Sequence, residues 1–152
     1  MSSAGVVVIG VGNAWAGDDA AGLLVARIVR QRAPQEVTVV EHEGEPTALL
    51  DAWEGAQLAI VVDAIRTDGK PGRVEVFDAT SHELPALWTA TSTHAFSVAQ
   101  AIELGRALGR LPRRLAVVGI EGASFSAGTR PGPAVTAALE PAAGRVLALA
   151  GA

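Results

Sequence analysis

Short apolar runs alternate along the chain with longer segments whose apolar residues recur at helical spacing. A continuous apolar run predicts a strand buried on both faces, whereas recurrence at helical spacing predicts an amphipathic helix. The expected strands span residues 6–9, 37–41, 58–62, 73–77 and 114–120. The expected helices span residues 18–31, 46–53, 94–108 and 134–148. Strands that alternate with helices in this way favour a parallel sheet connected by right-handed crossovers.

Residues 73–77 differ from the other expected strands because polar and apolar side chains alternate there. Alternation is typical of a strand exposed on one face, which puts this segment at an edge of the sheet. We therefore predict the α/β class, as a three-layer α/β/α sandwich around a mostly parallel, five-stranded twisted sheet with one antiparallel edge strand. No repeat or linker interrupts the pattern, so we expect one domain over residues 1–152.

Three positions carry helix-end signals. Pro46 suits the first turn of a helix, where its missing N–H costs nothing. Ser92 or Thr93 can cap the helix expected over residues 94–108, and Gly109 is well placed to end it.

Composition and charge exclude several classes of function. The 152 residues are 49% hydrophobic, which is enough to bury a large core. The formal net charge of -4 provides no basic surface for a phosphate backbone, so we expect no nucleic-acid partner. Cysteine is absent, which excludes disulfides, thiolate metal sites and cysteine nucleophiles. Any nucleophile is therefore oxygen-based.

We expect no targeting signal at the start of the chain. Residues 1–4 carry no positive side chain, and the apolar run after them is too short and too interrupted by glycine for a signal peptide or a membrane span. We expect a cytoplasmic protein with no membrane partner.

Polar residues follow the expected strands at three places. In open α/β sheets, ligands bind beyond the carboxyl ends of the strands, so these residues are the first candidates for a site. Asp18 and Asp19 end a glycine-rich turn after the first strand, Asp63 follows the third, and His94 begins a helix. Two carboxylates and an imidazole suit a divalent transition metal, and three ligands leave a coordination position open, as in a catalytic or recognition site.

Each candidate also has a purely structural interpretation. Asp18 and Asp19 can cap a helix and complement its dipole. Asp63 can accept N–H groups from the next turn, and His94 can be an ordinary first-turn residue. The other two histidines, His42 and His82, lie in segments that we expect to be solvated.

A dinucleotide site is a second possibility, because Gly10-x-Gly12 follows a strand. Trp15 occupies the position of the third glycine in that fingerprint and is too bulky for close approach of helix and strand. Acidic residues at the helix mouth also oppose a pyrophosphate, although Glu41 or Glu43 could bind a ribose. No GxSxG motif is present, and an aspartate dyad of Asp19 with Asp63 requires the fold to bring the two together.

Four motifs together resemble a known family. They are Gly10-Val11-Gly12-Asn13, Asp18-Asp19 with Gly22, Val62-Asp63-Ala64, and Ser92-x-His94 ahead of a helix. This pattern resembles the hydrogenase maturation proteases, the endopeptidases that trim the C-terminal extension of the nickel-iron hydrogenase large subunit. The resemblance implies an α/β/α fold and a metal-binding trio, which falls motif by motif on Asp19, Asp63 and His94. It also implies that cleavage follows nickel insertion into the precursor, with the nickel serving as a recognition element.

The sequence departs from the family pattern in places. Asp19 stands where the family also has the longer Glu, and residues 42–46 replace a Gly-Gly or Gly-Thr turn. The loop at residues 124–133 is richer in proline than expected.

We therefore hypothesise that Asp19, Asp63 and His94 are the catalytic and metal-binding residues. They would ligate nickel presented by the large-subunit precursor, and water would attack the scissile bond. Asp18 is either a base or a helix cap, and Trp15 either lines the cleft or covers the core. The isolated enzyme is expected to be a monomer that binds free metal weakly. The alternatives are a nucleotide-binding oxidoreductase domain and a non-catalytic metal-binding accessory module.

Overall fold

A computed structural model describes residues 5–89 and 93–151 of the chain, without the side chains of residues 87, 89 and 93–97. Its strands are β1 (Val6–Val11), β2 (Val37–His42), β3 (Leu58–Ile65), β4 (Val74–Asp78) and β5 (Arg114–Glu121). Its helices are α1 (Ala21–Arg32), α2 (Pro46–Trp53), α3 (Ala86–Thr89), α4 (Thr93–Leu108) and α5 (Pro133–Leu149), with a short 3-10 helix, η1 (Gly17–Ala20), before α1.

The strands form one five-stranded sheet in the order β2-β1-β3-β5-β4. β1 pairs in parallel with β2 and β3, and β3 pairs in parallel with β5. β4 pairs antiparallel with β5 at the edge. The mostly parallel sheet with one antiparallel edge strand confirms the predicted class. The edge strand, β4, is the segment whose alternating polar pattern indicated an edge position.

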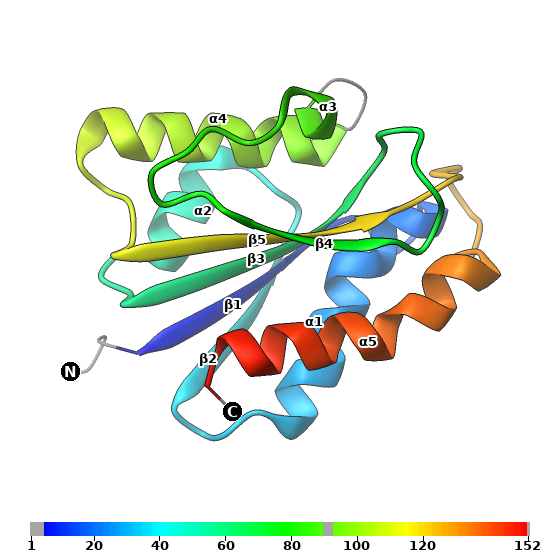
Figure 1. Cartoon of the computed structure of the whole chain (residues 1–152), viewed down its shortest axis with the longest axis horizontal. Helices are drawn as coiled ribbons and strands as arrows, with labels where there is room; N and C mark the ends of the chain where they lie inside the picture. Colours follow the sequence, from blue (N-terminus) through cyan, green and yellow to red (C-terminus); the bar gives the residue numbers. More distant parts are fainter. Residues whose placement is uncertain (1–4, 90–92, 152) are drawn as a thin grey trace.

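Helices cover both faces of the sheet (Figure 1). One layer contains α2, α3 and α4, and its core includes Trp53, Trp88 and Ile102. The other layer contains α1 and α5, and its core includes Val25 and Val146. The two sets of side chains come from opposite faces of the same strands, as period-two alternation requires.

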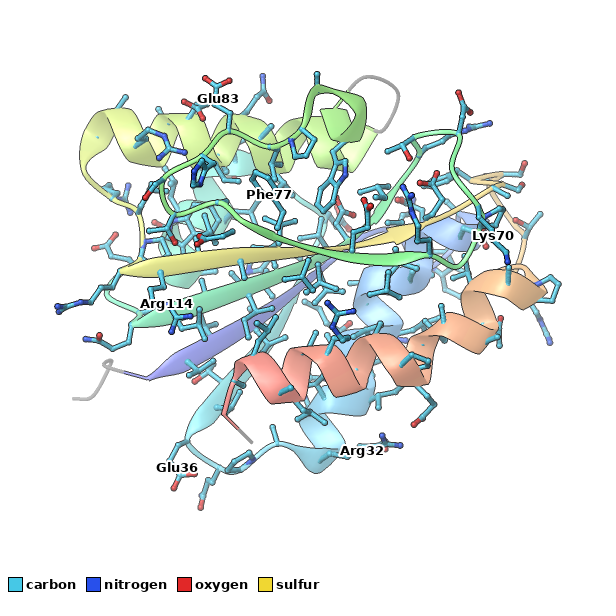
Figure 2. The ribbon with its side chains drawn as sticks, viewed as in Figure 1. Arg32, Glu36, Lys70, Phe77, Glu83 and Arg114 are labelled. Atoms are coloured by element: carbon cyan, nitrogen blue, oxygen red, sulfur yellow. The ribbon has the colours of Figure 1, made fainter. Side chains whose placement is uncertain are left out.

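The space between the sheet and each helix layer is filled by side chains (Figure 2). Phe77 on β4 points toward the layer with α3 and α4, and its ring centroid lies 6.0 Å from that of Trp88. Charged residues such as Glu36 and Glu83 lie at the periphery. Among the described residues, no helix is both long and apolar enough to cross a membrane.

Most element boundaries agree with the sequence-based predictions, with two informative differences. The helix predicted from residue 18 begins instead as η1 and continues as α1 from Ala21. The strand predicted to end at Val62 continues to Ile65, because residues 63–65 pair with residues 119–121 of β5. The short helix α3 was not predicted.

The helix-end predictions have different outcomes. Pro46 begins α2 as expected, and the side chain of Glu45 caps that helix by accepting the N–H groups of Thr47 and Ala48. Gly109 follows the last residue of α4 with φ of 68°. The predicted caps of α4 are not assessed, since Ser92 and the side chain of Thr93 lie outside the described residues.

Gly22, in the first turn of α1, lets that helix lie directly on the sheet. A Cβ atom at this position would lie 2.3 Å from the carbonyl oxygens of both Val11 and Val62. Only glycine fits such a contact between a helix and two strand backbones. The start of α1 is thereby fixed over the carboxyl ends of β1 and β3.

Candidate active site

The carboxyl ends of β1 and β3 form a topological switch point. From β1 the chain passes through α1, on one face, to β2; from β2 it passes through α2, on the opposite face, to β3 on the other side of β1. Ligands of open α/β sheets bind in the crevice at this point, where the connecting loops diverge. The acidic residues predicted from the sequence lie here.

Asp63 lies inside β3, and its neighbour across the sheet is Gly119 on β5. Every residue of β3 is buried, and Asp63 is only 1% exposed. Val61 and Ile65 belong to the core beneath α2 and α4, so alternation along the strand directs Asp63 to the same face. The carboxylate is therefore buried on the side of the sheet that α4 covers.

Asp19 lies in η1 and is 4% exposed. Its backbone N–H donates to the carbonyl of Ala16 at 3.1 Å, and its own carbonyl accepts the N–H of Asn13 at 3.3 Å. The N-cap residues of η1 and α1 are Ala16 and Ala20, and neither makes a side-chain hydrogen bond to its helix. η1 contacts β3, so the segments that carry Asp19 and Asp63 meet at the switch point.

Asp18 has a role that neither sequence-based alternative described. Its side chain is 2% exposed and accepts backbone N–H groups from Ala123, Ser124 and Gly132. It caps no helix, and three N–H donors occupy its oxygens. Of the two roles that the sequence left open for Asp18, the helix cap is therefore wrong, and the carboxylate binds the loop between β5 and α5.

His94 lies in the first turn of α4, and its side chain lies outside the described residues. Helix α4 leads into β5, which is parallel to β3, so the helix begins at the carboxyl edge of the sheet and ends at the amino edge (Figure 1). The backbone of His94 thus belongs to the edge that holds Asp19 and Asp63. Within the described side chains, which do not include His94, no group of three His, Cys, Asp or Glu residues could hold a metal.

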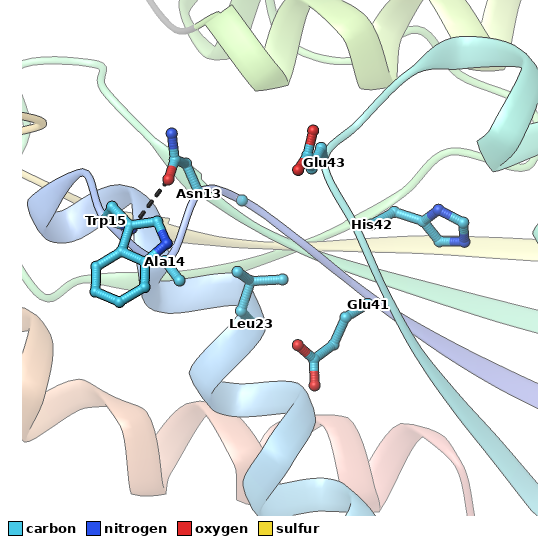
Figure 3. A pocket seen from close by; sticks show the side chains of 8 residues that line it. Asn13, Ala14, Trp15, Leu23, Glu41, His42 and Glu43 are labelled. Carbon is cyan, nitrogen blue, oxygen red and sulfur yellow. Dashed lines mark hydrogen bonds between the residues drawn. The ribbon is translucent and has the colours of Figure 1, made fainter. Parts of the chain in front are cut away.

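A pocket of about 420 Å³ opens beside this edge. Figure 3 shows the loop after β1, with Asn13, Ala14 and Trp15, on one side and the end of β2, with Glu41, His42 and Glu43, on the other. Trp15 is 78% exposed, so it lines the pocket and does not cover the core. The backbone N–H of Trp15 donates to Oδ1 of Asn13 at 2.9 Å.

Glu41 is held at the pocket wall by two arginines of α1. Arg27 and Arg30 each approach its carboxylate to 3.0 Å. The hydrogen bond from Arg27, with a further one from Arg30, lowers the pKa of Glu41 below its ordinary value. His42 is half-buried beside it and lines the pocket, whereas His82 is exposed as expected.

Comparison with known proteins decides the family. The model of the hydrogenase maturation protease family matches residues 23–149. The chain belongs to the hydrogenase maturation protease family. It is 30% identical to the hydrogenase 2 maturation protease of Escherichia coli over 147 residues, which cover 94% of this chain and 88% of that protein.

Solved structures of the family have the same fold. The hydrogenase maturating endopeptidase HybD of E. coli superposes with a TM-score of 0.83 at 29% identity, over 95% of this chain and 91% of that chain. The maturation protease HybD of Thermococcus kodakarensis gives a TM-score of 0.76 at 23% identity, over 96% of this chain and 99% of that chain. As a member of this family, the protein is a peptidase.

The dinucleotide alternative also fails on the geometry of the glycine-rich turn. Phosphate binding needs backbone N–H groups directed at the ligand. Here the N–H groups of Gly12, Gly17 and Asp18 donate to the carbonyl oxygens of His42, Thr129 and Ser124. This hydrogenase maturation protease therefore uses the turn to join its own loops.

Sequence analysis missed one buried carboxylate at this edge. Glu121, the last residue of β5, is fully buried and accepts the N–H of Thr67 at 2.7 Å and its hydroxyl at 2.5 Å. It thereby binds the loop between β3 and β4. The signal was present, because Glu121 ends a buried apolar run in the same way as Asp63.

Proposed function

We propose that this peptidase removes the C-terminal extension of a nickel-iron hydrogenase large-subunit precursor after nickel has been inserted. The observation that carries the proposal is the pair of buried carboxylates, Asp19 and Asp63, on segments that meet at the switch point of a hydrogenase maturation protease. The E. coli relative, named for hydrogenase 2, supports a hydrogenase as the substrate class.

Nickel enters this proposal as part of the substrate. Asp19, Asp63 and His94 offer two carboxylates and one imidazole, a donor set that borderline metals such as nickel accept. Three ligands leave coordination positions for the groups of the precursor that already hold the ion. A site of this kind binds free metal weakly and binds a metal-loaded precursor well.

The bound ion fixes the scissile peptide relative to the enzyme. Orientation of this kind lowers the barrier because the reacting groups are held together before reaction. Water then attacks the carbonyl carbon and the C–N bond breaks. The carbonyl carbon becomes a carboxyl group, and a proton passes to the leaving nitrogen, which becomes the new amino terminus of the released peptide.

The pocket beside the site gives the precursor a surface on which to bind. Tryptophan side chains are seldom this exposed to solvent. Tryptophan is also among the residue types that contribute most to the binding free energy of protein interfaces. Trp15 lies in the loop that leads from β1 into η1, the helix that carries Asp19, and its side chain is exposed. We therefore assign to Trp15 a contact with the precursor close to the cleavage site.

The test mixes the purified protein with a nickel-loaded large-subunit precursor from the same cell, beside a nickel-free precursor, and follows both by intact mass spectrometry. We expect loss of a C-terminal peptide from the nickel-loaded form alone. No loss from either form, with nickel loading verified, would contradict the proposal.

Substitution of the assigned ligands provides the matching variants. His94→Ala should abolish processing and leave the free energy of unfolding within about 1 kcal/mol of wild type, because a first-turn side chain at a site contributes little to stability. His82→Ala, at an exposed histidine away from this edge, is the control and should process normally. A large loss of stability in His94→Ala would support a structural role for His94 instead.

A further inference from the structure

The short helix η1, which carries Asp19, has no side-chain cap of its own. Its N-cap residue, Ala16, and the N-cap residue of α1, Ala20, make no side-chain hydrogen bond to their helices. Four residues of 3-10 helix are too few to be stable alone. The groups that hold η1 in place must come from elsewhere in the chain.

The side chain of Asp18 binds both ends of the loop formed by residues 122–132. Its Oδ2 accepts the N–H groups of Ala123 and Ser124 at 2.7 and 3.1 Å, directly after β5. Its Oδ1 accepts the N–H of Gly132 at 2.7 Å, directly before α5. One buried carboxylate therefore satisfies three backbone donors from a loop more than 100 residues away, as the sequence separations of 105, 106 and 114 show.

Backbone hydrogen bonds connect the same two segments. The N–H of Asp18 donates to the carbonyl of Ser124 at 2.9 Å, and that of Gly17 donates to Thr129 at 3.1 Å. In return, the N–H of Gly128 donates to the carbonyl of Trp15 at 2.6 Å. Figure 1 shows this loop, coloured yellow to orange, beside the blue segment that leads into α1.

We propose that Asp18 is a positioning residue: by binding residues 122–132 it fixes η1, and with it the place of Asp19 at the switch point. The proposal rests on the assignment of Asp19 to the metal-recognition site. Asp19 directly follows Asp18, and its carbonyl accepts the N–H of Asn13, so any movement of η1 reaches that hydrogen bond as well. In this proposal, the loop of residues 122–132 holds η1 in place and contacts no reacting atom.

Hydrogen exchange of the backbone amides tests the positioning without any substrate. In the wild type, the amides of Ala123, Ser124 and Gly132 should be protected. Asp18→Asn replaces one acceptor oxygen by an NH₂ donor, and we expect exchange at these amides and at Asn13 to rise at least ~10-fold. Val61, in the core of β3, reports global unfolding and should rise far less.

The matched control is Asp78→Asn. Asp78 also accepts a backbone N–H, from Thr80 at 2.9 Å, but its strand neighbour Ala116 is near the start of β5, at the opposite edge of the sheet. We expect faster exchange at Thr80 alone. Faster exchange of residues 123–132 in Asp18→Asn with no change at Asn13 would overturn the proposal, because the loop would then move without η1.

Catalysis separates a positioning role from a merely structural one. Under conditions where Asp18→Asn is folded, kcat on the nickel-loaded precursor should fall at least ~10-fold, with KM changed less than about twofold, because a misplaced ligand misaligns the bond to be cleaved. Asp78→Asn should cleave at the wild-type rate. A kcat of Asp18→Asn equal to that of the wild type would overturn the proposal. If the wild type itself does not cleave the precursor, that result counts against the proposed function, and hydrogen exchange at the Asn13 amide still tests the positioning role.

A second pair of variants keeps the test decisive if Asp18→Asn does not fold. Gly132 has φ of -70°, which suits proline, so Gly132→Pro replaces one N–H donor to Asp18 by a ring carbon that displaces Oδ1. Gly132→Ala keeps that donor, and its Cβ would lie an ordinary 3.6 Å from Oδ1 of Asp18. Faster exchange at Asn13 and lower kcat in the proline variant alone would support the proposal; equal behaviour of the two variants would overturn it.

Discussion

Among the described residues, the buried carboxylates are Asp18, Asp19, Asp63 and Glu121, and all of them lie toward the carboxyl edge of the sheet. Asp18 and Glu121 accept backbone N–H groups from neighbouring loops, which is how a buried charge is commonly stabilised. Asp19 and Asp63 lie on η1 and β3, two segments that contact each other. At the residue scale, Asp18 and Glu121 therefore join neighbouring loops to this edge, and the proposed function assigns metal recognition to Asp19 and Asp63.

Glu41, at the wall of the pocket, gives a prediction about pH. Arg27 and Arg30 lower its pKa in the folded protein, so their interaction stabilises the fold above the ordinary pKa of 4.5 and is lost as pH falls through the lower, folded-state pKa. Glu41→Gln should lower the free energy of urea unfolding by about 0.5–1 kcal/mol at about pH 7, a typical value for a partly exposed pair. At about pH 3, below the ordinary pKa, this difference should be smaller.

The control for this measurement is Glu36→Gln, at an exposed glutamate near the start of β2. It should have no comparable pH-dependent effect. A stability gap for Glu41→Gln that is the same at both pH values would contradict the explanation.

At the scale of elements, the contact between α1 and the sheet decides how closely the site is packed. Gly22, three residues after Asp19, packs against the backbones of β1 and β3. Its contact on β3 is Val62, the residue before Asp63. The same contact therefore sets the height of the helix above the sheet and the separation of the two segments that carry the candidate ligands.

This packing predicts opposite effects for two identical substitutions. Gly22→Ala should lower the free energy of unfolding by about 1–3 kcal/mol or more, because its Cβ would overlap two carbonyl oxygens. Gly144→Ala in α5 meets nothing within 4 Å and should raise it by about 0.4–1 kcal/mol through a less flexible unfolded chain. Thermal or urea denaturation of the two variants measures both, and effects of equal sign would contradict this description of the fold.

At the scale of the whole molecule, the two edges of the sheet differ in what they expose. Trp15 lies at the carboxyl edge beside the pocket and is 78% exposed. Leu108 is the last residue of α4 and is 57% exposed. It lies at the amino edge, because the segment after it approaches the start of β3, where the N–H of Arg113 donates to the carbonyl of Ala56. Only the first of these exposed apolar side chains neighbours the candidate site.

The proposed function predicts that these two residues respond differently to truncation. Trp15→Ala should raise KM for the nickel-loaded precursor about tenfold, equivalent to about 1.4 kcal/mol of binding, with little change in kcat. Leu108→Ala should leave both constants unchanged. Steady-state cleavage assays compare them, and an unchanged KM in Trp15→Ala would remove that side chain from the precursor-binding surface.

The sequence by itself determined the order of strands and helices, the antiparallel edge strand and the positions of Asp19, Asp63 and His94 along the chain. These properties depend on local periodicity and on motifs that each span a few residues. The tertiary structure alone decided that β3 continues past Asp63, because β5 supplies its hydrogen-bond partners. It also decided the roles of Asp18 and Glu121, whose N–H donors lie on loops distant in sequence, and such pairings leave no periodic signal in the chain.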